Sequence, residues 1–262
     1  MQRRNERAIV TFTTDFGARD AYAAAMKAAV LRECPEAALV DVTHEVARHD
    51  VLAGSITLER AVAQFAGIER VIHVCVVDPG VGTERPILAA LTAGPTPAWV
   101  ICPDNGLVTW AHHRVGFRSV WRVRYDQRLV SETFHGRDVM APLAGRLARE
   151  AVWGMPGPPH APVLLDVRPV PLAAGSGQVI HVDAFGNCTT NLLADAAGPG
   201  RQTRVRVAGR DLGPLRQTYA DVAPGQPLAL TGSSGLLEVA VRNGSAAEAL
   251  RIAVGDRVVV ES

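Results

Sequence analysis

Five polar clusters between residues 13 and 138 carry side chains that could bind a ligand or move a proton. Their sequences are TTDFG (13–17), DVTHE (41–45), DPGVGTER (78–85), PDNG (103–106) and TFHGRD (133–138). Carboxylates accept hydrogen bonds from hydroxyl and ammonium groups, and histidine titrates near neutral pH. Because turns alone do not need this many charged residues, the clusters indicate a polar ligand site.

The segments around these clusters have the patterns of alternating strands and helices. The predicted strands are 8–13, 38–43, 71–77, 86–92, 98–102 and 119–125. The predicted helices are one that begins at an N-cap Asp20 and two that cover 51–66 and 138–149. This order favours an α/β fold with a mostly parallel sheet covered on both faces. The carboxyl ends of parallel strands open onto one crevice, so the clusters are expected to meet there.

The composition changes near residue 155. Six prolines lie within 156–171, which indicates an extended linker. Short strands separated by glycine-rich turns follow at 178–183, 203–208, 227–230, 236–241 and 257–260. We therefore predict a Rossmann-like N-terminal domain over 1–155, a proline-rich linker over 156–174 and a small β-barrel or sandwich domain over 175–262.

The bulk properties exclude several classes of protein. The formal net charge is +1, which gives no reason to expect a nucleic-acid or anionic-membrane partner. No apolar run approaches the roughly 20 residues that span a bilayer, and the first residues do not resemble a signal peptide. We expect a soluble, cytoplasmic protein. The four cysteines lie far apart without a CxxC pair, which predicts reduced core cysteines and no zinc site.

Two familiar motifs begin in the sequence but are not completed. Gly80-Val81-Gly82 begins a dinucleotide fingerprint, but Arg85 stands where the closing glycine belongs. His44-Glu45 begins a zinc-protease motif, but Arg48 stands at the second histidine position and His49 is one residue late. No Walker loop or GxSxG elbow occurs either.

The clusters TTDFG, DPGVGTER, PDNG and TFHGRD, followed by FGNCTTNL (185–192) and GSSGLLEVAVRNG (232–244), resemble the SAM hydroxide adenosyltransferase family. These proteins hydrolyse S-adenosylmethionine (SAM) to adenosine and are related to SAM-dependent fluorinases and chlorinases. The resemblance runs from about residue 9 to the C-terminus. It implies a Rossmann-like domain, a C-terminal β-barrel and a homotrimer with SAM bound between domains of neighbouring subunits. SAM would be the substrate, with no additional cofactor and no metal.

The resemblance places the catalytic Asp-Arg-His triad of the family on Asp78, Arg85 and His135. Displacement at the ribose C5′ releases neutral methionine from a sulfonium, so a general acid is unnecessary. Positioning and activating water is the difficult part. We hypothesise that Asp78 accepts a hydrogen bond from this water, that the charge of Arg85 favours the carboxylate and hydroxide character, and that His135 orients or relays the proton.

The resemblance also assigns binding residues, with Asp15 as the acceptor for both ribose hydroxyls. The C-terminal assignments are Asp183 for the methionine ammonium, Phe185 as a packing wall or core residue, Asn187 as the adenine reader, Ser233 and Ser234 for the methionine carboxylate, and Arg242 with the backbone of Gly244 near the adenine. Structural alternatives are an Asx turn at Asp15 and an ordinary Gly-Ser-Ser-Gly turn. The chain departs from the halogenases at His49, where they carry a tryptophan.

Water is expected as the nucleophile in preference to a halide. A carboxylate at Asp78 would repel a halide by about 4 kcal/mol, for a separation of ~4 Å and an effective dielectric constant of ~20. Gly136 stands where the fluorinases carry a serine that helps to hold the halide.

Two other functions compete with SAM hydrolysis. A metal-dependent phosphohydrolase could use Asp15, Asp78, Asp104, His135 and Asp138 as ligands, although Arg85 beside Asp78 already balances its charge. A non-catalytic SAM-binding or sensing protein is the other alternative.

Overall fold

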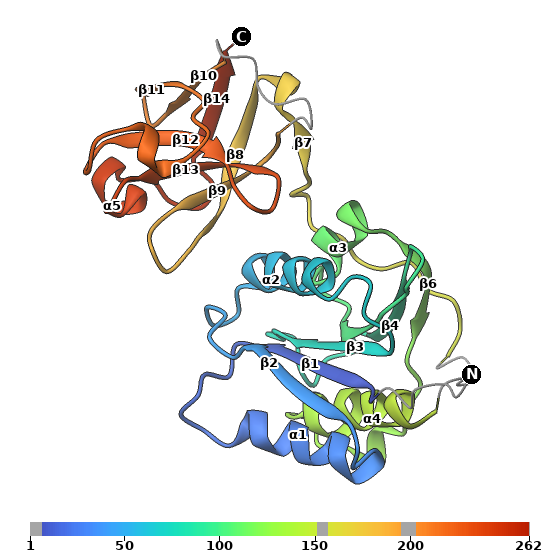
Figure 1. Cartoon of the computed structure of the whole chain (residues 1–262). Coiled ribbons are helices and arrows are strands. Elements are labelled where there is room, and N and C mark those ends of the chain that lie inside the picture. Colours follow the sequence, from blue (N-terminus) through green and yellow to red (C-terminus); the bar gives the residue numbers. More distant parts are fainter. Residues whose placement is uncertain (1–6, 151–156, 195–202, 262) are drawn as a thin grey trace, which may run out of the picture. The chain divides into compact units, whose positions relative to one another are not determined.

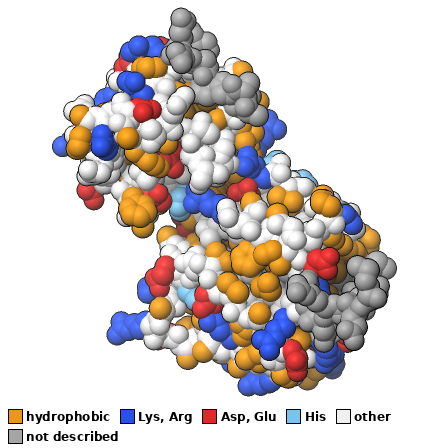
Figure 2. Space-filling model, viewed as in Figure 1, with side chains coloured by type: hydrophobic (Ala, Val, Ile, Leu, Met, Phe, Trp, Pro, Cys, Tyr) orange, Lys and Arg blue, Asp and Glu red, His pale blue; other side chains and the backbone are white. Residues whose placement is uncertain are grey.

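The computed structural model describes residues 7–150, 157–194 and 203–261. The chain divides into two compact units, Met1–Asp166 and Val167–Ser262 (Figure 1). The predicted boundary at 155/156 falls outside the described residues, so the domain limits stay a prediction. Acidic and basic side chains are interspersed over the face drawn in Figure 2, in keeping with the formal net charge of +1. No helix among the described residues is long and apolar enough to cross a membrane.

The first unit is built on a six-stranded sheet of order β2-β1-β3-β5-β4-β6. The strands are β1 (Ile9–Thr14), β2 (Ala38–Thr43), β3 (Val71–Val76), β4 (Ile87–Thr92), β5 (Trp99–Pro103) and β6 (Phe117–Arg122). Strands β2, β1, β3 and β5 pair in parallel, whereas β4 is antiparallel to both of its neighbours. The predicted mostly parallel sheet is therefore confirmed.

Helices cover both faces of this sheet (Figure 1). They are α1 (Tyr22–Glu33), α2 (Val51–Gln64), α3 (Thr109–Arg114) and α4 (Ala141–Arg149), the last preceded by a π-helical turn at Gly136–Met140. Every residue of β3 is buried because each face of the strand meets a different apolar cluster. Val74 and Val76 pack towards α1 and α4, and Cys75 packs towards α2.

The start of α1 corrects one prediction. The N-cap position is Ala21, not Asp20, and no side chain caps this helix. Met26, Ala29 and Val30 are buried on the sheet. The start of the helix is therefore determined by the packing of its apolar face and not by a capping side chain.

The four cysteines are buried and free, as predicted.

The second unit is a nearly closed antiparallel barrel, which confirms the predicted β-barrel. Its elements are β7 (Val170–Pro171), β8 (Ser176–Val182), β9 (Cys188–Leu193), β10 (Arg204–Val207), β11 (Arg210–Pro214), β12 (Pro227–Thr231), β13 (Leu236–Val241), α5 (Ala246–Leu250) and β14 (Arg257–Glu261). The strand order is β11-β10-β14-β8-β9-β13-β12, with β7 beside β9. Strands β9 and β11 were not predicted. The polar residues of β9 hide its strand pattern, yet Thr190 is buried and donates to the Leu237 carbonyl at 2.9 Å.

A buried histidine in the first unit should make folding sensitive to acid. His73 on β3 is 1% exposed, its Nδ1 lies 2.8 Å from Thr11 Oγ1, and burial lowers its pKa to about 4. Its contribution to stability is therefore complete above pH 6.5, the unfolded-state value, and is lost as the pH falls towards 4. We expect the free energy of unfolding to drop by about 3 kcal/mol from this residue between pH 7 and pH 4.

Urea unfolding at pH 7, 5 and 4 measures this loss. The double variant Thr11→Val/His73→Leu removes the imidazole and its partner together and should lose correspondingly less stability over the same range. Equal losses in the two proteins would show that His73 does not cause the acid sensitivity.

Candidate active site

Asp78, Arg85 and His135 converge in the first unit, although they come from two separate segments of the chain. Arg85 Nε donates to Asp78 Oδ1 at 2.8 Å, and Arg85 Nη2 donates to Asp78 Oδ2. The same Nη2 lies 3.0 Å from His135 Nδ1. The side chains of Asp78 and Arg85 are 6% and 9% exposed. The guanidinium therefore holds the carboxylate and the imidazole in a fixed, largely dry arrangement.

The loop that carries Asp78 and Arg85 is shaped by its own turn contacts and by a close backbone approach. Thr83 Oγ1 donates to the Gly80 carbonyl at 2.7 Å. Gly82 has φ +82°, and a Cβ at this position would lie 2.8 Å from the Glu132 carbonyl oxygen. Glycine is required there because the loop contacts the segment that leads to His135. Asn105 Nδ2 donates to the carbonyl of Val77 at 2.9 Å, and Val77 is the residue between the end of β3 and Asp78.

The contact with Arg85 fixes the tautomer of His135. A guanidinium can only donate, so His135 Nδ1 accepts and the neutral ring carries its proton on Nε2. Burial and then the charge of Arg85 lower the pKa of His135 below its ordinary value, against the opposing influence of Asp78 and Asp138. At neutral pH the imidazole is therefore uncharged and presents an N–H donor at Nε2.

A cavity of about 390 Å³ opens beside Asp78 and His135. Its lining residues are Asp15, Phe16, Tyr22, Arg48, His49, Val76, Asp78, Val81, Thr133, Phe134, His135 and Gly136. Arg85 is not among them, so it acts on the cavity through Asp78 and His135. The backbone N–H of His49, which has φ +65°, donates to Asp15 Oδ2 at 2.9 Å. Asp15 therefore lines the same cavity as Asp78 and His135.

Aromatic residues that the sequence analysis missed form one side of this cavity. Phe16, Tyr22 and Phe134 contact one another with ring centroids 5.4–5.8 Å apart. Tyr22 is the first residue of α1, and its side chain is half exposed. Phe134 directly precedes His135 in the TFHGRD cluster, and this position could have indicated that Phe134 lies at the site.

Two of the carboxylates proposed for a metal site are engaged elsewhere. Asp104 accepts from the Val163 N–H at 2.7 Å and lies 2.8 Å from His160 Nε2. Asp138 accepts from the Ser131 N–H and pairs with Arg137. In the ranges 7–150, 157–194 and 203–261 no three His, Cys, Asp or Glu residues are grouped so as to hold a metal ion.

The second unit carries a larger, more open cavity of about 790 Å³, which brings together most of its predicted site residues. Its lining residues are Phe185, Asn187, Thr218, Tyr219, Ala220, Val241, Arg242, Asn243, Gly244 and Ser245. Phe185 is 78% exposed, which removes the core alternative for this residue. Arg242 Nη1 donates to the Val222 carbonyl at 2.7 Å and so holds the segment that carries Tyr219. Thr218 and Tyr219 were not predicted.

Asp183 organises the β8–β9 loop of this unit. Its Oδ1 accepts from the N–H groups of Phe185 and Asn187, both at 2.9 Å, and its Oδ2 accepts from Asn187 Nδ2 at 3.1 Å. Ser233 and Ser234 lie in the turn between β12 and β13, at the opposite end of β13 from Arg242. They do not line the 790 Å³ cavity.

Two family models match the chain. Residues 10–154 match the SAM hydroxide adenosyltransferase N-terminal domain, and residues 177–259 match the C-terminal domain. The chain belongs to the SAM hydroxide adenosyltransferase family. One match falls on the α/β unit and the other on the barrel, so the family resemblance predicted from the sequence clusters is confirmed.

Individual relatives and a solved structure are similar to this SAM hydroxide adenosyltransferase family member over nearly its whole length. The chain is 38% identical to an (R)-S-adenosyl-L-methionine hydrolase of Salinispora tropica, with 95% of this chain and 96% of the relative covered. It is also 38% identical to an (R)-S-adenosyl-L-methionine hydrolase of Thermus thermophilus, with 94% and 96% covered. A crystal structure of an uncharacterized conserved protein from Thermotoga maritima superposes with a TM-score of 0.83 at 29% identity, covering 96% of this chain and all of that one.

Gly186 offers a test of the C-terminal cavity of this family member. It has φ +80°, and a Cβ there would lie 2.1 Å from Ser245 Oγ and 2.9 Å from Ser245 Cα. Gly186→Ala should therefore push the β8–β9 loop away from Ser245 and cost about 1–3 kcal/mol of stability. If this cavity holds the adenine, as the family resemblance implies, the variant should also weaken nucleoside binding at least tenfold. Thermal unfolding and calorimetric titration with adenosine measure the two effects.

Gly225→Ala is the matched control. Gly225 has nearly the same φ, +79°, but nothing lies within 4 Å of its added Cβ. It carries the backbone strain without the collision, so it should lower stability less and leave adenosine binding unchanged. If both variants bind adenosine equally well, the packing of Gly186 on Ser245 does not shape the cavity.

Proposed function

We propose that the chain hydrolyses SAM to adenosine and L-methionine by in-line attack of water at the ribose C5′. The observation that carries this proposal is the contact of Arg85 with both Asp78 and His135 at the wall of a cavity that also contains Asp15. The names of the relatives support the same reaction.

In this proposal the water is held between Asp78 and His135. Asp78 is the proton acceptor because Arg85 occupies His135 Nδ1. The remaining Nε2–H of His135 orients the water by donating to it, a narrower role than the proton relay expected from the sequence. Arg85 is the positioning residue for both and supplies a fixed positive charge as hydroxide character develops. Methionine leaves as a neutral thioether, so this step needs no acid.

The binding roles are assigned as the family resemblance implies. Asp15 accepts hydrogen bonds from the two ribose hydroxyls. Asn187 reads the adenine, with Arg242 and the Gly244 backbone near it, and Phe185 forms a packing wall. Asp183, Ser233 and Ser234 serve the methionine ammonium and carboxylate. We further propose that the chain acts in the cytoplasm as a homotrimer whose subunits complete one another's sites, with SAM as substrate and no cofactor.

The decisive experiment incubates the purified protein with SAM in ¹⁸O-labelled water. Adenosine labelled at the 5′-hydroxyl, together with methionine, is the expected product, and its formation should survive EDTA. Molar chloride should not divert the product to 5′-chloro-5′-deoxyadenosine, because Asp78 would repel the halide. SAM binding without turnover would favour the non-catalytic alternative, and activity lost to EDTA would favour a metalloenzyme.

A further inference from the structure

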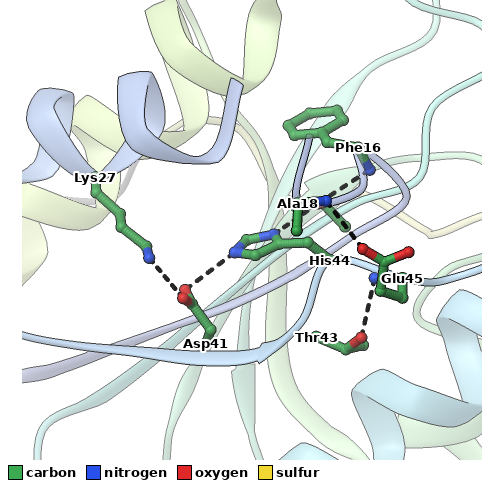
Figure 3. A network of polar contacts seen from close by, with 8 residues as sticks. Phe16, Ala18, Lys27, Asp41, Thr43, His44 and Glu45 are labelled. Carbon is green, nitrogen blue, oxygen red and sulfur yellow. Dashed lines mark hydrogen bonds and ion pairs between the residues drawn. The ribbon is translucent and has the colours of Figure 1, made fainter. Parts of the chain in front are cut away.

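A chain of polar contacts links α1, β2 and the end of β1, as Figure 3 shows. Lys27 Nζ, on α1, donates to Asp41 Oδ2 at 2.6 Å. Asp41 Oδ1 lies 3.0 Å from His44 Nε2, and His44 Nδ1 lies 2.8 Å from Thr14 Oγ1. Thr14 Oγ1 in turn accepts from the Phe16 N–H at 3.3 Å. Lys27 is the only lysine in the sequence.

The chemistry of these groups determines which atom donates and which accepts in each contact. The Asp41 carboxylate can only accept, so the neutral His44 ring places its proton on Nε2 and accepts at Nδ1 from the Thr14 hydroxyl. That hydroxyl then uses a lone pair for the Phe16 N–H. Partial burial raises the pKa of Asp41, but the hydrogen bonds and the charges of Lys27 and His44 together outweigh it and lower that pKa below its ordinary value.

This polar chain ends at the loop that carries Asp15. The same loop is tied to the residues around His44 by backbone contacts. The Gly17 N–H donates to the His44 carbonyl at 2.7 Å, and the Val46 N–H donates to the Thr14 carbonyl at 3.2 Å. The Ala18 N–H donates to Glu45 Oε1 at 2.9 Å. Asp15 therefore lies within a turn held on both sides by the 44–46 segment.

A carboxylate, an imidazole and a hydroxyl in sequence also suggest a nucleophile, but burial argues against that use. Thr14 has 0% of its surface exposed and does not line the 390 Å³ cavity, whereas Asp15 and Phe16, the next two residues, do. A hydroxyl that no substrate can reach can act only by holding its neighbours in place.

We propose that His44 is a positioning residue that acts through Thr14 to orient Asp15 towards the ribose hydroxyls, with Asp41 and Lys27 fixing the imidazole. The inference rests on the proposed role of Asp15 in nucleoside binding. The 41–45 cluster, which the proposed reaction itself leaves unused, thereby determines how strongly the site recognises a ribose diol.

The test compares binding of adenosine and 2′,3′-dideoxyadenosine, which lacks both hydroxyls, by calorimetry on the full chain. The unaltered protein should prefer adenosine at least tenfold, because hydrogen bonds to a charged acceptor are the stronger ones. Thr14→Val keeps the shape of the side chain but removes the hydroxyl, and should reduce the preference to less than about threefold. The Thr14→Ser variant retains the hydroxyl and should keep the preference for adenosine, whereas the His44→Leu variant should lose it. Asp15→Asn should lose it as well, and adding Thr14→Val to that variant should change little further.

Strand β1 provides a matched control. Thr11 is also buried on β1 and also contacts a histidine, with Oγ1 2.8 Å from His73 Nδ1, but it does not line the cavity. Thr11→Val should lower the melting temperature without changing the preference for adenosine. A structural role alone would make Thr11→Val and Thr14→Val behave alike.

The outcomes separate this inference from the proposed reaction. Loss of the preference in Thr14→Val and His44→Leu, with the preference kept in Thr11→Val, supports the positioning role even if SAM is not hydrolysed. An undiminished preference in Thr14→Val overturns it even if SAM is hydrolysed. An unaltered protein that does not favour adenosine over the dideoxynucleoside overturns it too, since Asp15 would then not bind the diol.

Discussion

Asp78→Asn is expected to lower kcat for SAM hydrolysis about a thousandfold while changing KM little. The amide keeps the size of the carboxylate and can still accept from Arg85 Nε, which lies 2.8 Å from Asp78 Oδ1. It cannot take a proton from water, however, and it leaves the guanidinium without its counter-charge. The loss should therefore appear in the chemical step, measured as adenosine released per enzyme per second under saturating SAM.

Asp104→Asn is the control for this variant. Asp104 directly follows β5, as Asp78 follows the end of β3, and its side chain is 2% exposed. It contacts His160 and the Val163 N–H, however, and not the cavity. Its amide variant should melt at a lower temperature and keep kcat within a few-fold of the unaltered protein. If Asp78→Asn retained a similar kcat, Asp78 could not be the acceptor for the water proton.

Arg85→Gln should lower kcat by about a hundredfold to a thousandfold and also move the pH profile. The charge of Arg85 is the second cause, after burial, of the lowered pKa of His135. His135 must be neutral for Nδ1 to accept, so activity is lost as the pH falls through that lowered pKa. Without the guanidinium charge the pKa rises, and the acid limb of kcat/KM should shift to higher pH.

The shift is measured from kcat/KM between pH 4.5 and 8 for both proteins. Arg137→Gln serves as the control because Arg137 belongs to the same segment as His135 but pairs with Asp138 at a partly exposed position. Its profile should follow that of the unaltered protein closely. An acid limb that stays in place in Arg85→Gln would mean that His135 does not set it.

The sequence patterns predicted the first unit well because its four inner strands, β1, β3, β5 and β4, are largely buried and rich in apolar or β-branched residues. β3 was the clearest pattern, and all six of its residues are buried. The convergence of Asp78, Arg85 and His135 could be expected because strand ends of a parallel sheet meet at one edge. The start of α1 could not, since Asp20 has the chemistry of a cap but apolar packing set the boundary.

The second unit was harder to predict for a physical reason. Antiparallel barrels bury polar side chains when these find partners, as Thr190 does, so β9 did not show an apolar pattern. The cavity residues Thr218 and Tyr219 lie in a stretch without strand or helix periodicity and came close to Asn187 only through the fold. Turn residues such as Ser233 carry no signal that separates a ligand contact from a tight turn.

The close approach of Gly82 to Glu132 has a consequence for how the reaction is prepared. It joins the segment that carries Asp78 and Arg85 to the one that carries His135, so these groups are in place before any substrate arrives. Binding free energy is then not spent on assembling them, and little reorganisation is left for the moment of bond breaking. In the proposed function, the ordering that a ligand must impose falls instead on side chains such as Phe185, which stands largely in solvent.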